Sequence, residues 1–117
     1  MRAAPERKVH VTRHEKVFLI TVSGETDYDD GSEFDAAWGA ADRAALPTTE
    51  VDLSRVTFAD SMLLNALLDG LRRHEEGGRT LVLVGPLTEA VDRLLTVSGT
   101  RELFTVTRTG TGPSQVS

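Results

Sequence analysis

The chain has 117 residues, a length typical of one domain, and its 13 basic and 18 acidic side chains give a net charge of −5. Because the basic residues are scattered among acids, no nucleic-acid-binding surface is predicted. The absence of cysteine excludes disulfides, thiolate metal sites and cysteine nucleophiles. The longest apolar run is far shorter than the ~20 residues of a membrane span, and the N-terminus lacks the apolar segment of a secretory signal. We therefore expect a cytoplasmic protein without membrane insertion.

The N-terminal part of the chain predicts a β-hairpin. Residues 1–7 have the composition of a flexible arm. Val9 and Val11 begin a first strand, the nearly continuous apolar run 17–22 predicts a second strand buried on both faces, and a turn lies between them. The acidic segment 23–31 is then predicted to be a loop.

An amphipathic helix is predicted after this loop. Asp30 or Ser32 is a candidate cap, Pro47 ends the helix, and Trp38 is expected in the core. The apolar residues recur at intervals of three and four, and they are Phe34, Ala37, Trp38, Ala41, Ala44 and Ala45.

The rest of the chain alternates between strands and helices. The predicted elements are a short strand at 51–53 continued by 56–58, a helix opened by Asp60–Ser61 and ended by Gly77–Gly78, a buried strand at 80–84, a helix from about Leu87 to Gly99, and a strand at 104–107. Residues 109–117 are expected to be flexible. With no internal repeat and no linker, residues 1–117 predict one α/β domain with a mixed, largely parallel sheet covered by helices.

The Asp60–Ser61 pair opens a helix with a face of leucines. Both side chains accept hydrogen bonds from free N–H groups at a helix start, so the simplest interpretation is a cap worth about 1 kcal/mol. The alternative is that one residue caps while Ser61 stays exposed as a phosphoacceptor. A phosphoryl group would add about −1.5 to −2 charges at pH 7, which a helix N-terminus favours and nearby acids oppose. The pair is therefore a candidate switch.

A catalytic role for Ser61 is not supported by its neighbours. The hydrolase pattern Gly-x-Ser-x-Gly is absent. The candidate bases are His10 and His14 in the predicted hairpin and His74 near a helix end, and nothing indicates that one of them meets the serine. No catalytic residue is predicted, so we expect a protein that is not an enzyme.

The acidic loop is a second candidate site. Its carboxylates could bind Mg²⁺ or Ca²⁺, but their spacing is not that of an EF-hand, and no Gly-Lys-Ser/Thr phosphate-binding motif is present. A solvated surface loop is the simpler interpretation, so no metal and no cofactor are predicted. A small-ligand or nucleotide binder remains the weaker hypothesis. The acids are Glu25, Asp27, Asp29 and Asp30.

From about Val9 to Val106, the chain resembles the STAS domain family, and within it the bacterial anti-sigma factor antagonists. The landmarks are Gly24-Glu25-Thr26-Asp27, Val51-Asp52-Leu53-Ser54, Val56-Thr57-Phe58-Ala59-Asp60-Ser61, and Val97-Ser98-Gly99 followed by Leu103-Phe104. The resemblance implies a mixed sheet of four to five strands with helices mainly on one face.

The resemblance also implies a regulatory function without catalysis. Such antagonists bind an anti-sigma factor that is also a serine kinase, and this binding frees the sigma factor to regulate transcription initiation. The kinase phosphorylates the antagonist, which ends the complex, and a serine phosphatase restores it. Carried over by position, Ser61 is the implied phosphoacceptor, Asp60 its neighbour at the helix start, and Asp27 an acid near the switch.

Two residues depart from the family pattern. After the Asp–Ser pair the family has a small hydroxyl residue and a glycine, whereas this chain has Met62 and Leu63. The added bulk lies where a kinase would dock, and we expect Met62 to offer an exposed, adaptable contact. These residues motivate an alternative function, a STAS adaptor that is not phosphorylated and serves a larger regulatory or transport assembly, such as a lipid-transport or stressosome-like complex.

Overall fold

The structure is a computed structural model that describes residues 8–26 and 30–107. Within these ranges, five strands build one mixed sheet in the order β1-β2-β3-β4-β5, as expected for this α/β fold class. The elements are β1 (Val9–His14), β2 (Val17–Glu25), α1 (Gly31–Ala44), β3 (Thr48–Phe58), α2 (Ser61–Glu76), β4 (Thr80–Val84), α3 (Glu89–Ser98), a short 3-10 helix (Arg101–Leu103) and β5 (Thr105–Thr107).

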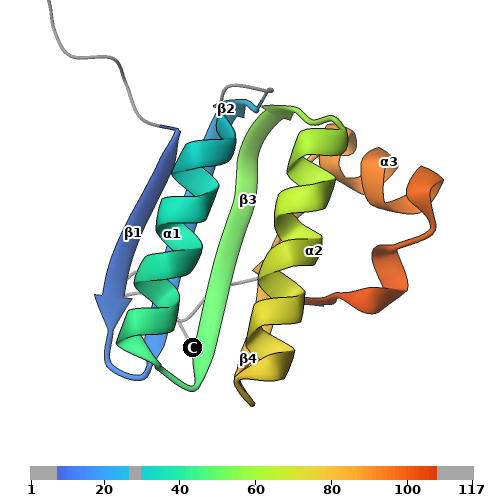
Figure 1. Cartoon of the computed structure of the whole chain (residues 1–117). Helices are drawn as coiled ribbons and strands as arrows, with labels where there is room; N and C mark the ends of the chain where they lie inside the picture. The colour runs from blue at the N-terminus through green and yellow to red at the C-terminus, as the bar shows by residue number, and fades with distance from the viewer. Residues whose placement is uncertain (1–7, 27–29, 108–117) are drawn as a thin grey trace, which may run out of the picture.

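The sheet combines one antiparallel hairpin with parallel pairs. β1 and β2 pair antiparallel around a turn in which Glu15 adopts a left-handed conformation with φ 58°, which confirms the predicted hairpin. The pairs β2–β3, β3–β4 and β4–β5 are parallel because a helix returns the chain between them. The carboxyl ends of β2 and β3 therefore meet at one end of the sheet (Figure 1).

The helices α1 and α2 lie side by side over one face of the sheet, with α3 beyond α2 (Figure 1). On β2, Phe18, Ile20 and Val22 are buried, whereas the alternating residues between them are only half-buried. The prediction of burial on both faces of β2 is therefore wrong. The helices cover only one face of the sheet, and β2 lies next to the edge strand β1.

The strand β3 is longer than predicted. Instead of two short runs separated by a polar interruption, residues 48–58 form one strand of 11 residues. The interruption is a bulge: between the pairs Thr21–Asp52 and Ser23–Arg55, β3 advances by one residue more than β2. The Asp52 carboxylate accepts hydrogen bonds from the backbone N–H and the hydroxyl of Ser54, at 2.9 and 2.7 Å, and so satisfies polar groups at the irregularity.

The boundary between β2 and α1 also differs from the prediction. β2 continues to Glu25 inside the segment expected to be a loop, because Gly24, at φ 82°, still pairs with Val56 of β3. α1 has Asp30 as its N-cap residue, without a side-chain cap bond, and Ala45 ends the helix before Pro47. The predicted ends of α2 and α3 at glycines are confirmed, with Gly77 and Gly99 as C-caps.

The packed core joins the three helices to the sheet. Trp38 is buried as predicted, and Leu63 and Leu67 of α2 and Val91 and Leu95 of α3 are fully buried. Among the helices of the described residues, none is long and apolar enough to cross a membrane.

Candidate functional site

At the start of α2, Asp60 caps the helix and Ser61 exposes its hydroxyl. Asp60 has an extended backbone, and its carboxylate accepts a hydrogen bond from the Met62 backbone N–H at 3.0 Å. Its carbonyl accepts the first helical bond, from Leu64 N–H at 3.2 Å. Because Asp60 is the cap, Ser61 is free to occupy the first helical position, where it is exposed to solvent. This arrangement matches the alternative in which one residue caps and the other remains accessible.

The two residues that depart from the family pattern are directed toward the core. Leu63 is fully buried, and Met62 is half-buried and packs against the core. The expectation of an exposed Met62 is therefore wrong, because the first turn of α2 already turns this side chain toward the packed face. The bulk that replaces the small residues lies largely beneath the surface that carries Ser61.

An open apolar groove adjoins Ser61 between the end of β3, the start of α2 and the helix α3. Its volume is about 890 Å³, and its walls include Leu64, Ala90 and Leu94 as well as Ser61. Two large apolar side chains on it face solvent: Phe58 is 50% exposed and Val97 is 81% exposed. The charged residues on the groove, Glu89 and Arg93, are 3.8 Å apart and both highly exposed, so the groove presents a mainly apolar surface.

The loop after β2 is fastened to the end of β3 next to this groove. Thr26 is fully buried and donates both its backbone N–H and its hydroxyl to the carbonyl of Phe58, at 3.1 and 2.9 Å. Lys8 links Glu25 to Asp30, because its ammonium donates to the Glu25 carbonyl at 2.6 Å and to the Asp30 carboxylate at 3.3 Å. Asp27, the acid expected near the switch, and Asp29 lie outside the described residues.

The other candidate chemistry does not converge on Ser61. The histidines lie elsewhere: His10 and His14 are on β1, and His74 is buried near the other end of α2. Within the described ranges, no group of three or more histidine, aspartate or glutamate side chains could hold a metal ion.

Reasoning from the sequence missed three residues of this region. From the sequence, Phe58 and Val97 are ordinary apolar residues of a strand and a helix. Only the fold places both of them, exposed, on the same groove. Thr26 lies within one of the family landmarks, but its contact could not be predicted, because its partner lies 32 residues further along the chain.

Comparisons place the chain in a family. A family model described as "Mlab, STAS domain" matches residues 9–106, so the chain belongs to the STAS domain family. No match is found among curated proteins.

Solved structures share the fold. An anti-sigma factor antagonist from Mycobacterium paratuberculosis is 27% identical, with a TM-score of 0.72 over 86% of this chain and 85% of that chain. An anti-sigma factor antagonist domain protein from Planctomyces limnophilus is 24% identical, with a TM-score of 0.70 over 87% and 91%. The Bacillus cell fate determinant SpoIIAA in its phosphorylated form is 19% identical, with a TM-score of 0.66 over 84% and 89%. Two of these three neighbours are thus anti-sigma factor antagonists by name.

Proposed function

We propose that this chain is an anti-sigma factor antagonist that binds an anti-sigma factor serine kinase and is released when Ser61 is phosphorylated. It would act in the cytoplasm, indirectly on transcription initiation and without catalysis, and a serine phosphatase would reverse the switch. The observation that carries the proposal is the placement of Ser61, exposed at the first position of α2 and on the edge of an apolar groove. Membership of the STAS family and the 27% identical antagonist support the same role.

The physical basis of the proposed switch is a change of charge on an apolar surface. The Phe58 and Val97 side chains would supply the apolar contact with the partner. A phosphoryl group on Ser61 would bring about −1.5 to −2 charges to the edge of that contact. Asp60, one residue away, would add like charge, so a partner that covers the groove would have to bury both charges and would bind less tightly.

The second candidate is a STAS adaptor that docks through the same groove without phosphorylation. It is favoured by Leu63, which fills the core where the family has glycine. The packing beneath Ser61 therefore differs from that of the family pattern. In this case, the partner would contact Phe58 and Val97 and would be indifferent to charge at Ser61.

Phosphorylation of Ser61 is tested by incubating the chain with ATP and each anti-sigma factor kinase of the source organism in turn. We expect one phosphoryl group on the wild type by intact mass and none on Ser61→Ala. Ser98→Ala is the matched control, because Ser98 is also exposed and lies on the same groove. Equal labelling of Ser61→Ala and the wild type would show that the acceptor is another residue.

Binding measurements separate the two candidates. For an antagonist, the kinase that labels the chain should bind the wild type and lose at least tenfold in affinity for Ser61→Asp. A partner that binds the wild type and Ser61→Asp equally well, with no labelling by any kinase, would favour the adaptor.

A further inference from the structure

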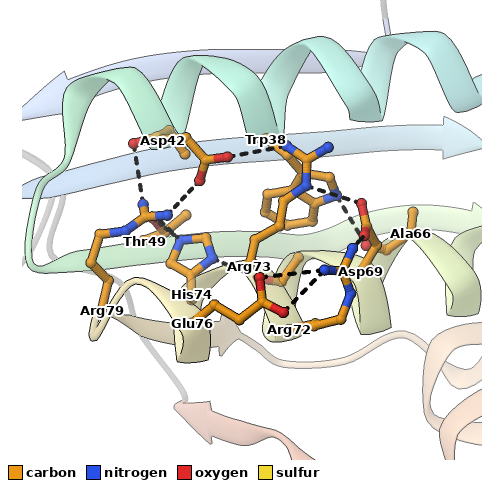
Figure 2. A network of polar contacts seen from close by, with 12 residues as sticks. Trp38, Asp42, Thr49, Ala66, Asp69, Arg72, Arg73, His74, Glu76 and Arg79 are labelled. Carbon is orange, nitrogen blue, oxygen red and sulfur yellow. Dashed lines mark hydrogen bonds and ion pairs between the residues drawn. The ribbon is translucent and has the colours of Figure 1, made fainter.

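His74 is the most enclosed titratable side chain of the α1–α2 contact, and it lies near the end of α2 opposite Ser61. Its side chain is fully buried. Figure 2 shows the imidazole between α1, β3 and the turn that precedes β4. The Trp38 indole and the imidazole form a T-shaped pair with ring centroids 5.9 Å apart.

The hydrogen bonds of the ring define its protonation state. Nδ1 lies 2.7 Å from the carbonyl oxygen of Gly70, which can only accept, so Nδ1 carries a proton. Nε2 lies 2.6 Å from the hydroxyl of Thr49. In the neutral ring Nε2 is an acceptor, so Thr49 donates to it. A guanidinium nitrogen of Arg79, a donor only, lies 3.5 Å from the same atom. The surroundings therefore suit the neutral ring protonated at Nδ1.

The charges around His74 disfavour a second proton. α2 contributes Arg73 and the turn before β4 contributes Arg79, both cationic, while α1 contributes the carboxylate of Asp42. That carboxylate is already paired with both guanidiniums, with Arg73 at 3.2 Å and with Arg79 through a short contact. β3 contributes the neutral Thr49 hydroxyl, and the neighbouring Glu50 points to the opposite face of the sheet by strand alternation.

Burial is the main cause that lowers the pKa of His74, and the charge of Arg79 lowers it further, whereas the Gly70 carbonyl and Asp42 act in the opposite direction.

We propose that His74 is an acid-sensitive latch, which in its neutral form fastens the C-terminal half of α2 to β3 and α1 and which releases that half when Nε2 takes a proton. The incoming proton occupies the lone pair that accepts the Thr49 O–H bond, so that bond is lost. The ring then holds a buried positive charge beside Arg79. Both effects act on the last turns of α2.

The direction of the pH dependence follows from linkage. The unfolded chain protonates this histidine near a pH of about 6.5, whereas the folded chain resists protonation until a lower pH. The stabilising contribution of neutral His74 is therefore complete above about pH 6.5 and is lost as the pH falls through the folded-state pKa.

The protonation state is tested by NMR of the imidazole nitrogens of the full chain during an acid titration. We expect neutral His74 to carry its proton on Nδ1 and to titrate below about 6.5, with signals assigned through His10→Gln and His14→Gln. Thr49→Val removes the donor to Nε2 and should raise the pKa of His74, while Thr49→Ser keeps the donor and should leave that pKa unchanged. A proton on Nε2, or a pKa at or above about 6.5, would overturn the latch.

Release of the helix end is tested by hydrogen exchange of the wild type at pH 7.5 and pH 5, corrected for intrinsic rates. Amides of residues 70–79 should lose more protection at pH 5 than amides of β2 and β3. His74→Gln cannot titrate and should not show this selective loss, whereas the double variant His10→Gln/His14→Gln should behave as the wild type. If His74→Gln does not fold, the proposal is tested by comparing the wild type with Thr49→Val. Residues 70–79 of Thr49→Val should lose protection at a higher pH than the same residues of the wild type. A uniform loss across the sheet and α2 would contradict the proposal.

Discussion

At the scale of single residues, the contact between α1 and α2 depends on the absence of one methyl group. A Cβ atom at Gly70 would lie 2.3 Å from Cζ2 of Trp38, and two further indole carbons lie within 2.6 Å. The indole is fixed in place, because it is buried and its Nε1–H donates to the Ala66 carbonyl at 3.0 Å. Gly70 is therefore required for the close approach of the two helices.

The substitution Gly70→Ala should destabilise the protein although alanine is the better helix former. The helical preference is worth about 1 kcal/mol, whereas an overpacked core costs about 1–3 kcal/mol and this contact falls at the upper end. We expect a net loss of about 1–2 kcal/mol in the free energy of unfolding, measured with urea.

Gly39→Ala is the control, since a Cβ there meets only the flexible end of Arg43 at 3.4 Å. This substitution should stabilise the protein by up to about 1 kcal/mol. If both variants were stabilised, the close packing of Trp38 on Gly70 would be incorrect.

At the scale of elements, the first turn of α2 supports two roles with neighbouring residues. Asp60 supplies the hydrogen bond that the helix start requires, which leaves Ser61 exposed. Helix stability and the proposed switch therefore depend on different side chains, and they can be tested separately.

Asp60→Ala should lower the free energy of unfolding by about 1 kcal/mol, while Asp60→Asn should leave it within about 0.5 kcal/mol. The amide oxygen of asparagine replaces the carboxylate as acceptor for Met62 N–H, so the cap survives while the charge is removed. Urea denaturation at pH 7 measures both variants. An equal loss in Asp60→Asn would mean that the charge at the helix N-terminus, rather than the hydrogen bond, provides the stability.

At the scale of the whole molecule, the parallel strands bring the proposed switch and the groove to one end of the sheet. Thr26 fastens the loop after β2 to Phe58, Ser61 begins α2 three residues beyond Phe58, and α3 supplies Val97 on the other side. The fold thus builds one groove from β3, α2 and α3, which are separate elements of the chain.

Val97→Asp should weaken partner binding without affecting the fold. Val97 is 81% exposed, so its replacement should change the free energy of unfolding by no more than about 0.5 kcal/mol. A charge within the apolar contact should weaken binding to the proposed partner kinase at least tenfold, or about 1.4 kcal/mol. Titration calorimetry with that kinase measures the effect.

Leu103→Asp is the matched control for this prediction, because Leu103 is 57% exposed but does not lie on the groove. It should bind the kinase as the wild type does. Equal losses in the two variants would place the contact elsewhere on the molecule.

Local patterns in the sequence determined most of the fold. The signals for the helices are local, because each depends on residues only a few positions apart. They are the spacing of Phe34 and Trp38, the leucines of α2, and the glycines at 77 and 99. The order, type and ends of the helices could therefore be predicted from them. The same holds for the hairpin and for the position of Asp60 and Ser61 at a helix start.

Only the tertiary structure decided which distant residues meet. The bulge in β3 depends on its pairing with β2, and the groove depends on Phe58 and Val97 coming from elements far apart in the chain. His74 looked like a polar residue near a helix end, but it is buried because α1, β3 and the turn before β4 close around it. Periodicity records which way a side chain points along its own element, whereas burial and chemical environment are set by the partners that packing brings to it.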